Sequence, residues 1–328
     1  MLEIQTTEGI TFSADAEETV LDAALSAGLF FPHSCKSGRC NTCRCRVISG
    51  EFSNVLPPLG LSVQETKAGY ALGCAIMPRT DLILDKVSVF PFALPKEQLL
   101  PCRIFALRNL CQDIIELEVR FPPGKQLNYL PGQFVDILFQ GKQRSYSIAN
   151  VGHNDGNVCF HIKRVAEGVF SEYLFEKANL NDLLRIRGPY GTFFPRNVVG
   201  KHLVFLATGT GYGPVAAIIK NLLQNKEARG FESISLFRGV RKVEELYKNN
   251  EKMLSEIAYH PTVSQPPPSW KGDTDYVQKL AIKKIDDLSN VIVFACGSIV
   301  MVEDAKSDFV KNGINDENFF SDAFISSG

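Results

Sequence analysis

The chain has 328 residues, 45% of them apolar and 22% charged, and its 35 Lys and Arg residues nearly balance 36 Asp and Glu residues. This balance argues against a polybasic nucleic-acid-binding protein, and the length predicts two or three domains of roughly 100 to 200 residues. No apolar run approaches the roughly 18 residues of a membrane span, and the first residues lack a signal-peptide core. We therefore expect a cytoplasmic protein whose nine cysteines serve metal or redox chemistry rather than disulfides.

The first 90 residues predict a small domain that mixes strands with a helix. Thr19 is placed to cap a helix whose apolar residues share one face, and Gly28 is placed to end it. The segments that alternate as strands do are 3–13, 45–52 and 81–89. The Pro-containing stretch 90–97 that follows is interpreted as a linker.

Four cysteines between residues 35 and 45 form the most specific motif of this domain. The spacing of Cys35, Cys40 and Cys43, followed by a distant Cys74, is typical of the ligands of a plant-type 2Fe-2S cluster. A zinc site is the alternative, but zinc motifs normally pair two short spacings or include His. A Rieske centre would need His ligands on one iron. Cys45 is expected to be a buried thiol.

The cysteine loop is also rich in cations. These are Lys36, Arg39, Arg44 and Arg46. Next to a negatively charged cluster they would make reduction easier, or they form an ordinary solvated basic face. The alternative from a different functional class is a non-enzymatic protein in which a structural zinc finger is attached to a nucleotide-binding module.

Residues 97–197 have mostly period-two patterning, which predicts an antiparallel β-barrel with one helix. The residues 168–171, "GVFS", stand at the start of that helix, where free N–H groups favour a pyrophosphate. Arg144 offers a forked donor to the same anion, and Tyr146 offers a stacking face. Each motif alone is typical of an ordinary N-cap or strand, but the two together on one barrel predict a pyrophosphate site.

From residue 198 onward strands alternate with helices, which predicts a parallel sheet with crossover helices. The turn "GTGYGP" precedes a helix that is expected to start at Pro214, and a phosphate suits this place. The turn departs from the G-x-G-x-x-G fingerprint, because Pro214 stands where a third Gly is required. Cys296 follows a later strand at the edge where such sheets bind ligands.

Together these motifs resemble the iron-sulfur flavoprotein reductases of the ferredoxin-NADP reductase superfamily, over the whole chain. The resemblance implies a multidomain fold: an α+β ferredoxin (β-grasp) domain at 1–90, an antiparallel β-barrel FAD domain at 97–197, and an α/β parallel-sheet NAD(P)H domain at 198–328. Ser147, near flavin N5, and Cys296, near the nicotinamide, are the implied catalytic residues. The implied cofactor contacts are Arg144, Ser145, Tyr146, Ser147, Gly168, Val169, Phe170, Ser171, Gly209, Thr210, Gly211, Pro214, Arg238, Arg241, Cys296, Gly297, Ser298 and Phe324.

The resemblance implies that NADH gives a hydride to FAD and that single electrons then pass through a 2Fe-2S cluster to a partner protein. NADPH stays open, because Arg238 and Arg241 are able to pair with a 2′-phosphate. Two residues depart from the family pattern: Asn41 stands where Gly or Ser is frequent, and Arg238 stands where an aromatic is frequent.

A closer resemblance, in "RSYSIAN", "GVFSEYLF" and the tail "ENFFSDAF", is to the glucoseen-reductase branch of this family. That branch serves dideoxysugar biosynthesis, and it implies a pyridoxamine-phosphate-dependent sugar dehydrase as electron acceptor. The alternative partner is the oxygenase component of an aromatic-ring or methane-type oxygenase system.

Overall fold

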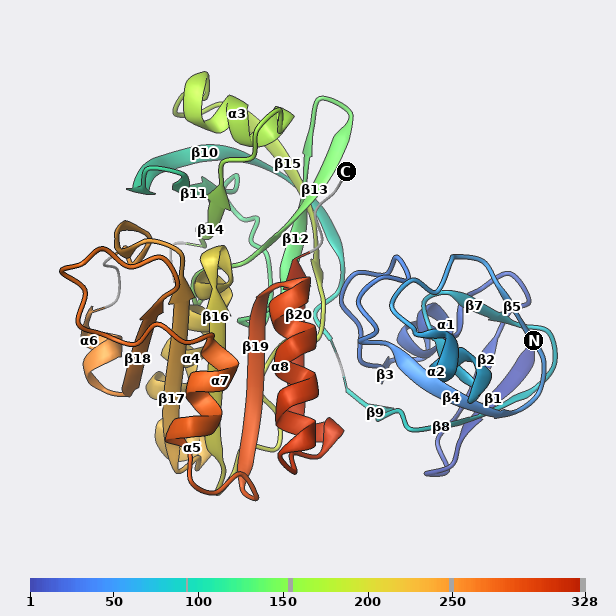
Figure 1. Ribbon diagram of the computed structural model, residues 1–328. Helices are drawn as coiled ribbons and strands as arrows, with labels where there is room; N and C mark the ends of the chain where they lie inside the picture. Colours follow the sequence, from blue (N-terminus) through green and yellow to red (C-terminus); the bar gives the residue numbers. More distant parts are fainter. Residues whose placement is uncertain (93, 153–155, 248–250, 325–328) are drawn as a thin grey trace. The chain divides into compact units, whose positions relative to one another are not determined.

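The computed structural model describes residues 1–92, 94–152, 156–247 and 251–324. The chain divides into two compact units, Met1–Pro95 and Lys96–Gly328 (Figure 1). In the second unit we distinguish the barrel module, from β10 to β15, and the sheet module, from β16 to β20. Within the described ranges, none of the helices combines the length and apolarity that a bilayer span requires.

The first unit is built on a five-stranded mixed sheet of order β2-β1-β8-β4-β6, in which β1 and β8 are parallel. Its elements are β1 (Leu2–Thr6), β2 (Thr11–Ala14), α1 (Val20–Ser26), β3 (Leu29–Phe30), β4 (Arg44–Ser49), β5 (Phe52–Asn54), α2 (Val63–Lys67), β6 (Tyr70–Leu72), β7 (Ile76–Pro78), β8 (Leu82–Asp85) and β9 (Phe90–Pro91). Helix α1 packs against this sheet and buries Val20, Leu21, Ala23 and Ala24. The predicted α+β architecture is confirmed.

The ends of α1 follow from local chemistry. The Thr19 side chain accepts a hydrogen bond from the Asp22 N–H at 3.1 Å, as predicted, and Gly28 lies just beyond the helix with φ +73°. Helix α2 lies in a stretch that the sequence pattern predicts as a loop, and it begins with a capping box between Ser62 and Glu65. Residues 90 and 91, at the start of the predicted linker, pair with β3, so they belong to the first unit.

The barrel module is a curled antiparallel sheet of order β13-β12-β15-β10-β11-β14. Its elements are β10 (Gln98–Cys111), β11 (Ile114–Arg120), β12 (Phe134–Phe139), β13 (Lys142–Ser147), β14 (Val158–Lys163), α3 (Val169–Glu176) and β15 (Leu183–Tyr190). An isolated bridge between Ile148 and Phe160 draws the two edge strands, β13 and β14, together. The predicted antiparallel barrel with one helix is therefore confirmed as a half-barrel.

The sheet module is a parallel sheet of order β18-β17-β16-β19-β20. Its elements are β16 (His202–Thr208), η1 (Gly209–Gly211), α4 (Tyr212–Gln224), α5 (Lys226–Arg229), β17 (Ser233–Val240), η2 (Val243–Glu245), α6 (Glu251–Ser255), β18 (Ala258–Val263), α7 (Val277–Lys284), β19 (Val291–Ser298), α8 (Ile299–Lys311), η3 (Asp316–Asn318) and β20 (Phe319–Phe324). Helices α7 and α8 lie in front of the sheet in Figure 1, and α4 lies behind it.

Alternating residues of β16 build the two cores of this module. Leu203 and Phe205 pack on the α4 side, whereas Val204 and Leu206 pack on the side of α7 and α8. Helix α4 begins at Tyr212, two residues before the predicted start at Pro214. Proline is compatible with this position because the first N–H groups of a helix have no partner within it.

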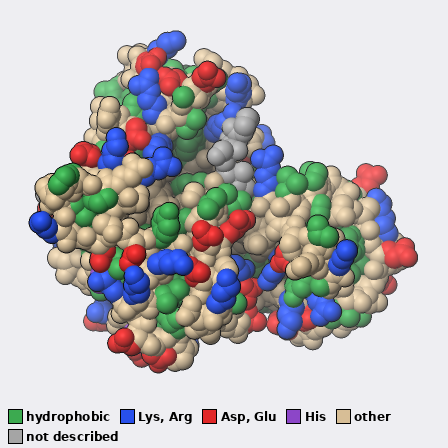
Figure 2. Space-filling model, viewed as in Figure 1, with side chains coloured by type: hydrophobic (Ala, Val, Ile, Leu, Met, Phe, Trp, Pro, Cys, Tyr) green, Lys and Arg blue, Asp and Glu red, His purple; other side chains and the backbone are tan. Residues whose placement is uncertain are grey.

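The barrel and sheet modules meet along what we call the module seam. On the barrel side the seam comprises β13, β14 and residues 193–196. On the sheet side it comprises residues 212–213, Tyr247, β19 and β20. The Phe193 ring lies 6.1 Å from that of Phe294, and the Arg196 guanidinium lies 4.4 Å above the Phe320 ring. These shared apolar contacts explain why both modules form one compact unit. On the face drawn in Figure 2, basic and acidic side chains are interspersed, in keeping with the near-zero net charge.

Candidate functional site

The four predicted iron ligands lie together in the first unit as two pairs of thiols. Hydrogen bonds link Cys35 with Cys40, and Cys43 with Cys74. Two thiols for each metal ion is the division that a two-iron cluster requires. The donor set therefore fits a 2Fe-2S cluster.

Each thiol pair favours one thiolate, the form that binds iron. The hydrogen bond from Cys40 lowers the pKa of Cys35 to about 5, and the hydrogen bond from Cys43 lowers the pKa of Cys74. Cys43 and Cys74 are buried, whereas Cys35 and Cys40 are partly exposed. Electrons would thus leave the site most directly on the side of Cys35 and Cys40.

The fifth cysteine of the motif lies apart from these pairs. Cys45 is fully buried in β4, and its thiol points to the Ala71 carbonyl oxygen at 3.7 Å. Burial raises the pKa of Cys45 to about 12, so this thiol stays protonated. The expectation of a buried packing thiol agrees with this position.

The cations of the loop are largely paired. Arg44 forms an ion pair with Glu65 at 2.6 Å, and Lys36 forms one with Asp22 at 3.3 Å. The Arg46 Nε donates to the Ala68 carbonyl oxygen at 3.1 Å, and Arg39 is exposed. These carboxylates offset part of the positive charge that the loop would otherwise place beside the cluster.

The unusual Asn41 has a conformational reason in this loop. Its φ is +49°, in the left-handed region that Gly and Asn adopt at low cost. Gly60 packs closely against this part of the loop, since a Cβ at Gly60 would lie 2.7 Å from the Asn41 backbone nitrogen. Asn41 therefore preserves the backbone path that a Gly would allow.

We expect Asn41→Val to lower the free energy of unfolding by about 1–2 kcal/mol, because a β-branched residue is strained at positive φ. Asn41→Gly should stay within about 1 kcal/mol of the wild type. Urea denaturation of the full chain measures both values. Asn54→Val is the control, because Asn54 is the exposed last residue of strand β5. Equal losses for Asn41→Gly and Asn41→Val would contradict this account.

The side chains of the predicted FAD residues lie on both faces of β13, because side chains alternate along a strand. Ser145 donates to the Asp136 carboxylate at 2.6 Å, and Ser147 donates to the Asp322 carboxylate at 3.0 Å. Arg144 and Tyr146 lie on the opposite face of the strand. Burial raises the pKa of Tyr146 to about 12, so its phenol stays protonated and its ring offers a neutral stacking surface.

The second FAD motif forms the start of α3. Ser171 accepts from the Val165 N–H at 3.1 Å and thereby ties down the preceding loop. Phe170 is buried and packs 5.7 Å from the Tyr146 ring. No side chain caps the helix at Gly168, so the first-turn N–H groups, together with Arg144, supply a donor set that fits a pyrophosphate.

In the sheet module, the predicted NAD(P)H residues converge between β16 and β19. The strand order reverses there, with β17 and β18 on one side and β20 on the other, and such switch points bind ligands in open α/β sheets. Gly209 and Thr210 follow β16 directly, and Cys296, Gly297 and Ser298 end β19.

Gly211 brings these two segments into contact. A Cβ at this position would lie 2.4 Å from the Cys296 carbonyl oxygen and 2.9 Å from the Gly297 nitrogen. The neighbours are backbone atoms, so only glycine allows this approach. At Gly209, by contrast, no atom lies within 4 Å of the position that a Cβ would occupy, so the space beside the turn is open. The turn therefore fits a pyrophosphate that lies against its backbone.

Asp322 belongs to this site although it is not among the residues predicted from the sequence. It is 5% exposed, lies beside Cys296 in the β19–β20 pairing and accepts the hydrogen bond from Ser147. Burial and the Asp322 carboxylate raise the pKa of the Cys296 thiol well above its usual value. The predicted catalytic pair of Ser147 and Cys296 is thus brought to one place by a carboxylate of β20.

The remaining predicted contacts of this module have different surroundings. Ser298 caps α8 by accepting from the Met301 N–H at 3.3 Å. Arg238 is only 2% exposed and lies between the rings of Tyr212 and Tyr247, so its guanidinium is buried rather than facing a solvent-accessible phosphate site. Arg241 is exposed in the loop after β17. Of the two arginines considered for a 2′-phosphate, only Arg241 is accessible.

Three family models match consecutive parts of the chain. The 2Fe-2S iron-sulfur cluster binding domain matches residues 3–79, the oxidoreductase FAD-binding domain matches residues 101–194, and the oxidoreductase NAD-binding domain matches residues 205–307. These ranges contain, in turn, the paired thiols, the barrel motifs and the glycine turn. The predicted cofactors, a 2Fe-2S cluster, FAD and a nicotinamide nucleotide, agree with the three models.

Two relatives and one solved structure extend this similarity over the whole chain. The CDP-6-deoxy-L-threo-D-glycero-4-hexulose-3-dehydrase reductase of Yersinia pestis is 36% identical over 97% of both chains. The xylene/toluene monooxygenase electron transfer component XylA of Pseudomonas putida is 32% identical over 97% of this chain and 91% of its own. The crystal structure of the Amycolatopsis cytochrome P450 reductase GcoB shares the fold, with a TM-score of 0.77 at 24% identity over 99% of both chains.

Proposed function

The chain belongs to the iron-sulfur flavoprotein reductases of the ferredoxin-NADP reductase superfamily, and we propose that it is a cytoplasmic reductase that supplies electrons from NADH to a pyridoxamine-phosphate-dependent sugar dehydrase. The 36% identity with a Yersinia pestis reductase named for such a dehydrase supports this acceptor, since the match covers 97% of both chains. The proposed role is electron delivery during removal of a sugar hydroxyl in dideoxysugar biosynthesis.

The observation that carries the reductase function is the meeting of the barrel and sheet motifs at one point of the module seam. Ser147 of β13 donates to Asp322 of β20, and Asp322 lies beside Cys296 of β19. The flavin of an FAD held by Arg144 and α3 and the nicotinamide of a nucleotide whose pyrophosphate lies on the glycine turn would therefore approach each other at Ser147 and Cys296. We assign residues 1–90 to the cluster, 97–197 to FAD and 198–328 to NAD(P)H.

The residues at this point position the reactants and leave the transferred electrons to the cofactors. A bound FAD would supply the conversion between the electron pair of a hydride and the single electrons that a 2Fe-2S cluster carries. Asp322 fixes the Ser147 hydroxyl, and the protonated Cys296 thiol presents no charge to the nicotinamide. This part of the reaction needs no nucleophile from the protein.

NADH is the proposed nucleotide. Arg238 is enclosed by Tyr212 and Tyr247, which leaves Arg241 as the accessible cation of the predicted pair. A single exposed cation supports a weaker preference for a 2′-phosphate than two cations that act together. Paired kinetics with NADH and NADPH measure this preference directly.

The second candidate function is the reductase component of an oxygenase system. The 32% identity with the xylene/toluene monooxygenase component XylA supports it, again over most of both chains. Both functions use the same three cofactor sites and differ only in the protein that receives the electrons.

We expect the FAD- and cluster-loaded protein, mixed with NADH, a purified sugar dehydrase and its CDP-sugar, to yield the deoxygenated sugar. The rate should fall as salt is raised, because the exposed Arg39 beside the cluster loop attracts an acidic partner. Product is measured by chromatography and NADH oxidation by absorbance.

Omission of the reductase is the control for this assay. NADH oxidation with a standard one-electron acceptor, but no deoxygenated sugar with the dehydrase, would reject the sugar-dehydrase assignment while leaving the reductase intact. Coupled oxidation of an aromatic substrate by an oxygenase component would then favour the second candidate.

A further inference from the structure

His161 occupies the module seam at a place that the reductase function does not assign. It lies on β14 of the barrel module, is 7% exposed, and its Nδ1 lies 2.9 Å from the Tyr247 hydroxyl of the sheet module. The two rings meet edge to face, with centroids 5.5 Å apart. One side chain of the barrel is thus joined to the loop that follows β17.

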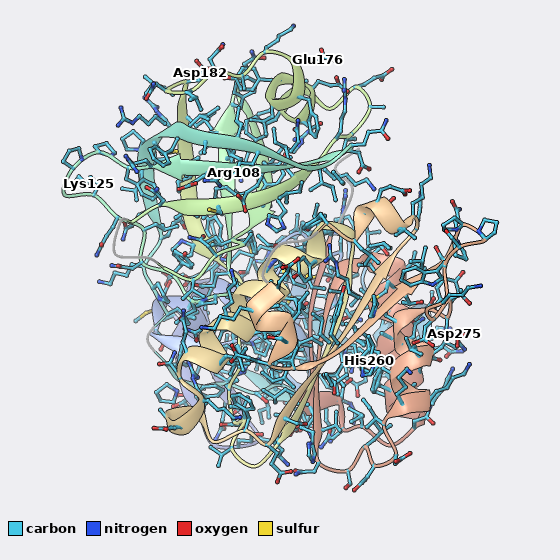
Figure 3. All side chains as sticks on the ribbon, turned by 90° about the vertical axis from the view of Figure 1, so that its left-hand side faces the viewer. Arg108, Lys125, Glu176, Asp182, His260 and Asp275 are labelled. Atoms are coloured by element: carbon cyan, nitrogen blue, oxygen red, sulfur yellow. The ribbon has the colours of Figure 1, made fainter. Side chains whose placement is uncertain are left out.

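The other nitrogen of His161 is held by the barrel itself. Nε2 lies 3.5 Å from the Glu116 carboxylate on β11, and Glu116 pairs with Arg108 of β10 at 2.5 Å; Figure 3 labels Arg108 on its strand. The hydrogen bond from His161 lowers the pKa of Glu116, and burial lowers the pKa of His161. A neutral imidazole therefore donates from Nε2 to Glu116 and accepts at Nδ1 from Tyr247.

The sheet module also packs tightly against His161 at Gly213, two residues after Gly211. A Cβ at Gly213 would lie 3.0 Å from His161 Nδ1 and 3.0 Å from the Ala149 Cβ. A larger residue would push the helix start away from β14. The glycine here serves packing between modules, whereas Gly211 serves contact with β19.

The partner of His161 is itself rigidly held. The Arg238 guanidinium lies 4.4 Å from the Tyr247 ring and 3.7 Å from the Tyr212 ring, and its Nη1 donates to the Tyr247 carbonyl oxygen at 3.2 Å. Tyr212 is the first residue of α4. A continuous series of contacts therefore links Glu116, His161, Tyr247 and Arg238 to α4, the helix that follows the glycine turn.

We propose that His161 is a positioning residue that sets the register of the glycine turn on the barrel, and thereby the alignment in which NADH meets the flavin. It is not among the residues proposed to contact NADH or FAD. Its two nitrogens bind different modules, so its loss frees the turn to shift relative to the barrel while the turn keeps its own shape and its proposed contacts with NADH. The proposal rests on the NADH-to-flavin half of the proposed function and is independent of the acceptor.

The test compares His161→Phe with the wild type in single-turnover reduction of the FAD holoenzyme by NADH. We expect the limiting rate to fall about tenfold, with the NADH concentration for half-maximal rate unchanged, because alignment rather than binding is lost. His161→Gln, which keeps one donor and one acceptor, should recover most of the rate. In the FAD-free protein, amide hydrogen exchange at Gly211–Val215 should accelerate in His161→Phe while β15 keeps its protection.

Two further variants keep the test decisive. Tyr247→Phe removes only the hydroxyl and should slow the reaction, and the double variant should be no slower than His161→Phe, because both changes break one connection. His202→Phe is the matched control, since the half-buried His202 begins β16, at the end of that strand away from the glycine turn. Additive losses, or wild-type rates in both single variants, would overturn the proposal. A wild-type holoenzyme that NADH does not reduce would instead reject the proposed function.

Discussion

Flavin reduction by NADH in Gly211→Ala is expected to be about 100-fold slower than in the wild type. The φ of Gly211 is −60°, which any residue adopts, so the loss comes from crowding alone. The new Cβ would lie 2.4 Å from the Cys296 carbonyl oxygen, and neither backbone segment is able to move without opening the crevice between β16 and β19. Stopped-flow absorbance of the FAD holoenzyme measures the rate.

Gly200→Ala is the matched control for this prediction. Gly200 has φ +66° with nothing within 4 Å of its Cβ position, so alanine is strained there but not crowded. We expect a loss of about 1 kcal/mol in the free energy of unfolding and an unchanged rate with NADH. A normal rate in Gly211→Ala, or an equal loss in both variants, would show that the contact with Cys296 does not shape the nicotinamide site.

Most of the fold was predictable because its patterns are local. Alternation along β10–β15 predicted the antiparallel barrel, and the change to strand and helix after residue 198 predicted the parallel sheet. The spacing of Cys35, Cys40 and Cys43 predicted the cluster loop, since three ligands on one short loop leave a signature in the sequence. Thr19 and Gly28 predicted the limits of α1 for the same reason.

The features that escaped prediction depend on contacts between distant residues. Ser147 and Asp322 are 175 positions apart, and His161 and Tyr247 are 86 apart. No local sequence pattern distinguishes Asp322, although it lies in the tail "SDAF", whose last residue, Phe324, is a predicted cofactor contact. The sequence signal for it is a polar residue near the end of the last parallel strand, because that strand lies next to the strand of Cys296.

Arg238 shows how burial changes the meaning of a residue. An arginine in "FRGVR", after a nucleotide-binding turn, suggests a phosphate ligand. In the structure the guanidinium donates to the Glu245 and Tyr247 carbonyl oxygens, and its Nε has no hydrogen-bond partner among the described residues. The two tyrosine rings accommodate the charge, so this arginine acts within the sheet module instead of at its surface.

Cys40→Ser is expected to lower the NADH-driven reduction of a one-electron protein acceptor such as cytochrome c at least about 100-fold. Flavin reduction by NADH in the same variant should keep the wild-type rate, since the barrel and sheet modules hold both reactants and form a compact unit apart from residues 1–95. The substitution removes one thiol from the Cys35–Cys40 pair, and a serine hydroxyl is a poor replacement for a thiolate. Stopped-flow absorbance and cytochrome reduction separate the two half-reactions.

Cys45→Ser supplies the matched control, because Cys45 lies in the same motif yet is buried away from both thiol pairs. A serine there retains a donor for the Ala71 carbonyl oxygen, and we expect both half-reactions to proceed as in the wild type. If Cys40→Ser slowed both half-reactions equally, the cluster loop would be needed for the integrity of the whole chain rather than for delivery of single electrons. Loss of delivery alone, in Cys40→Ser but not in Cys45→Ser, assigns the exit of electrons to the four paired thiols.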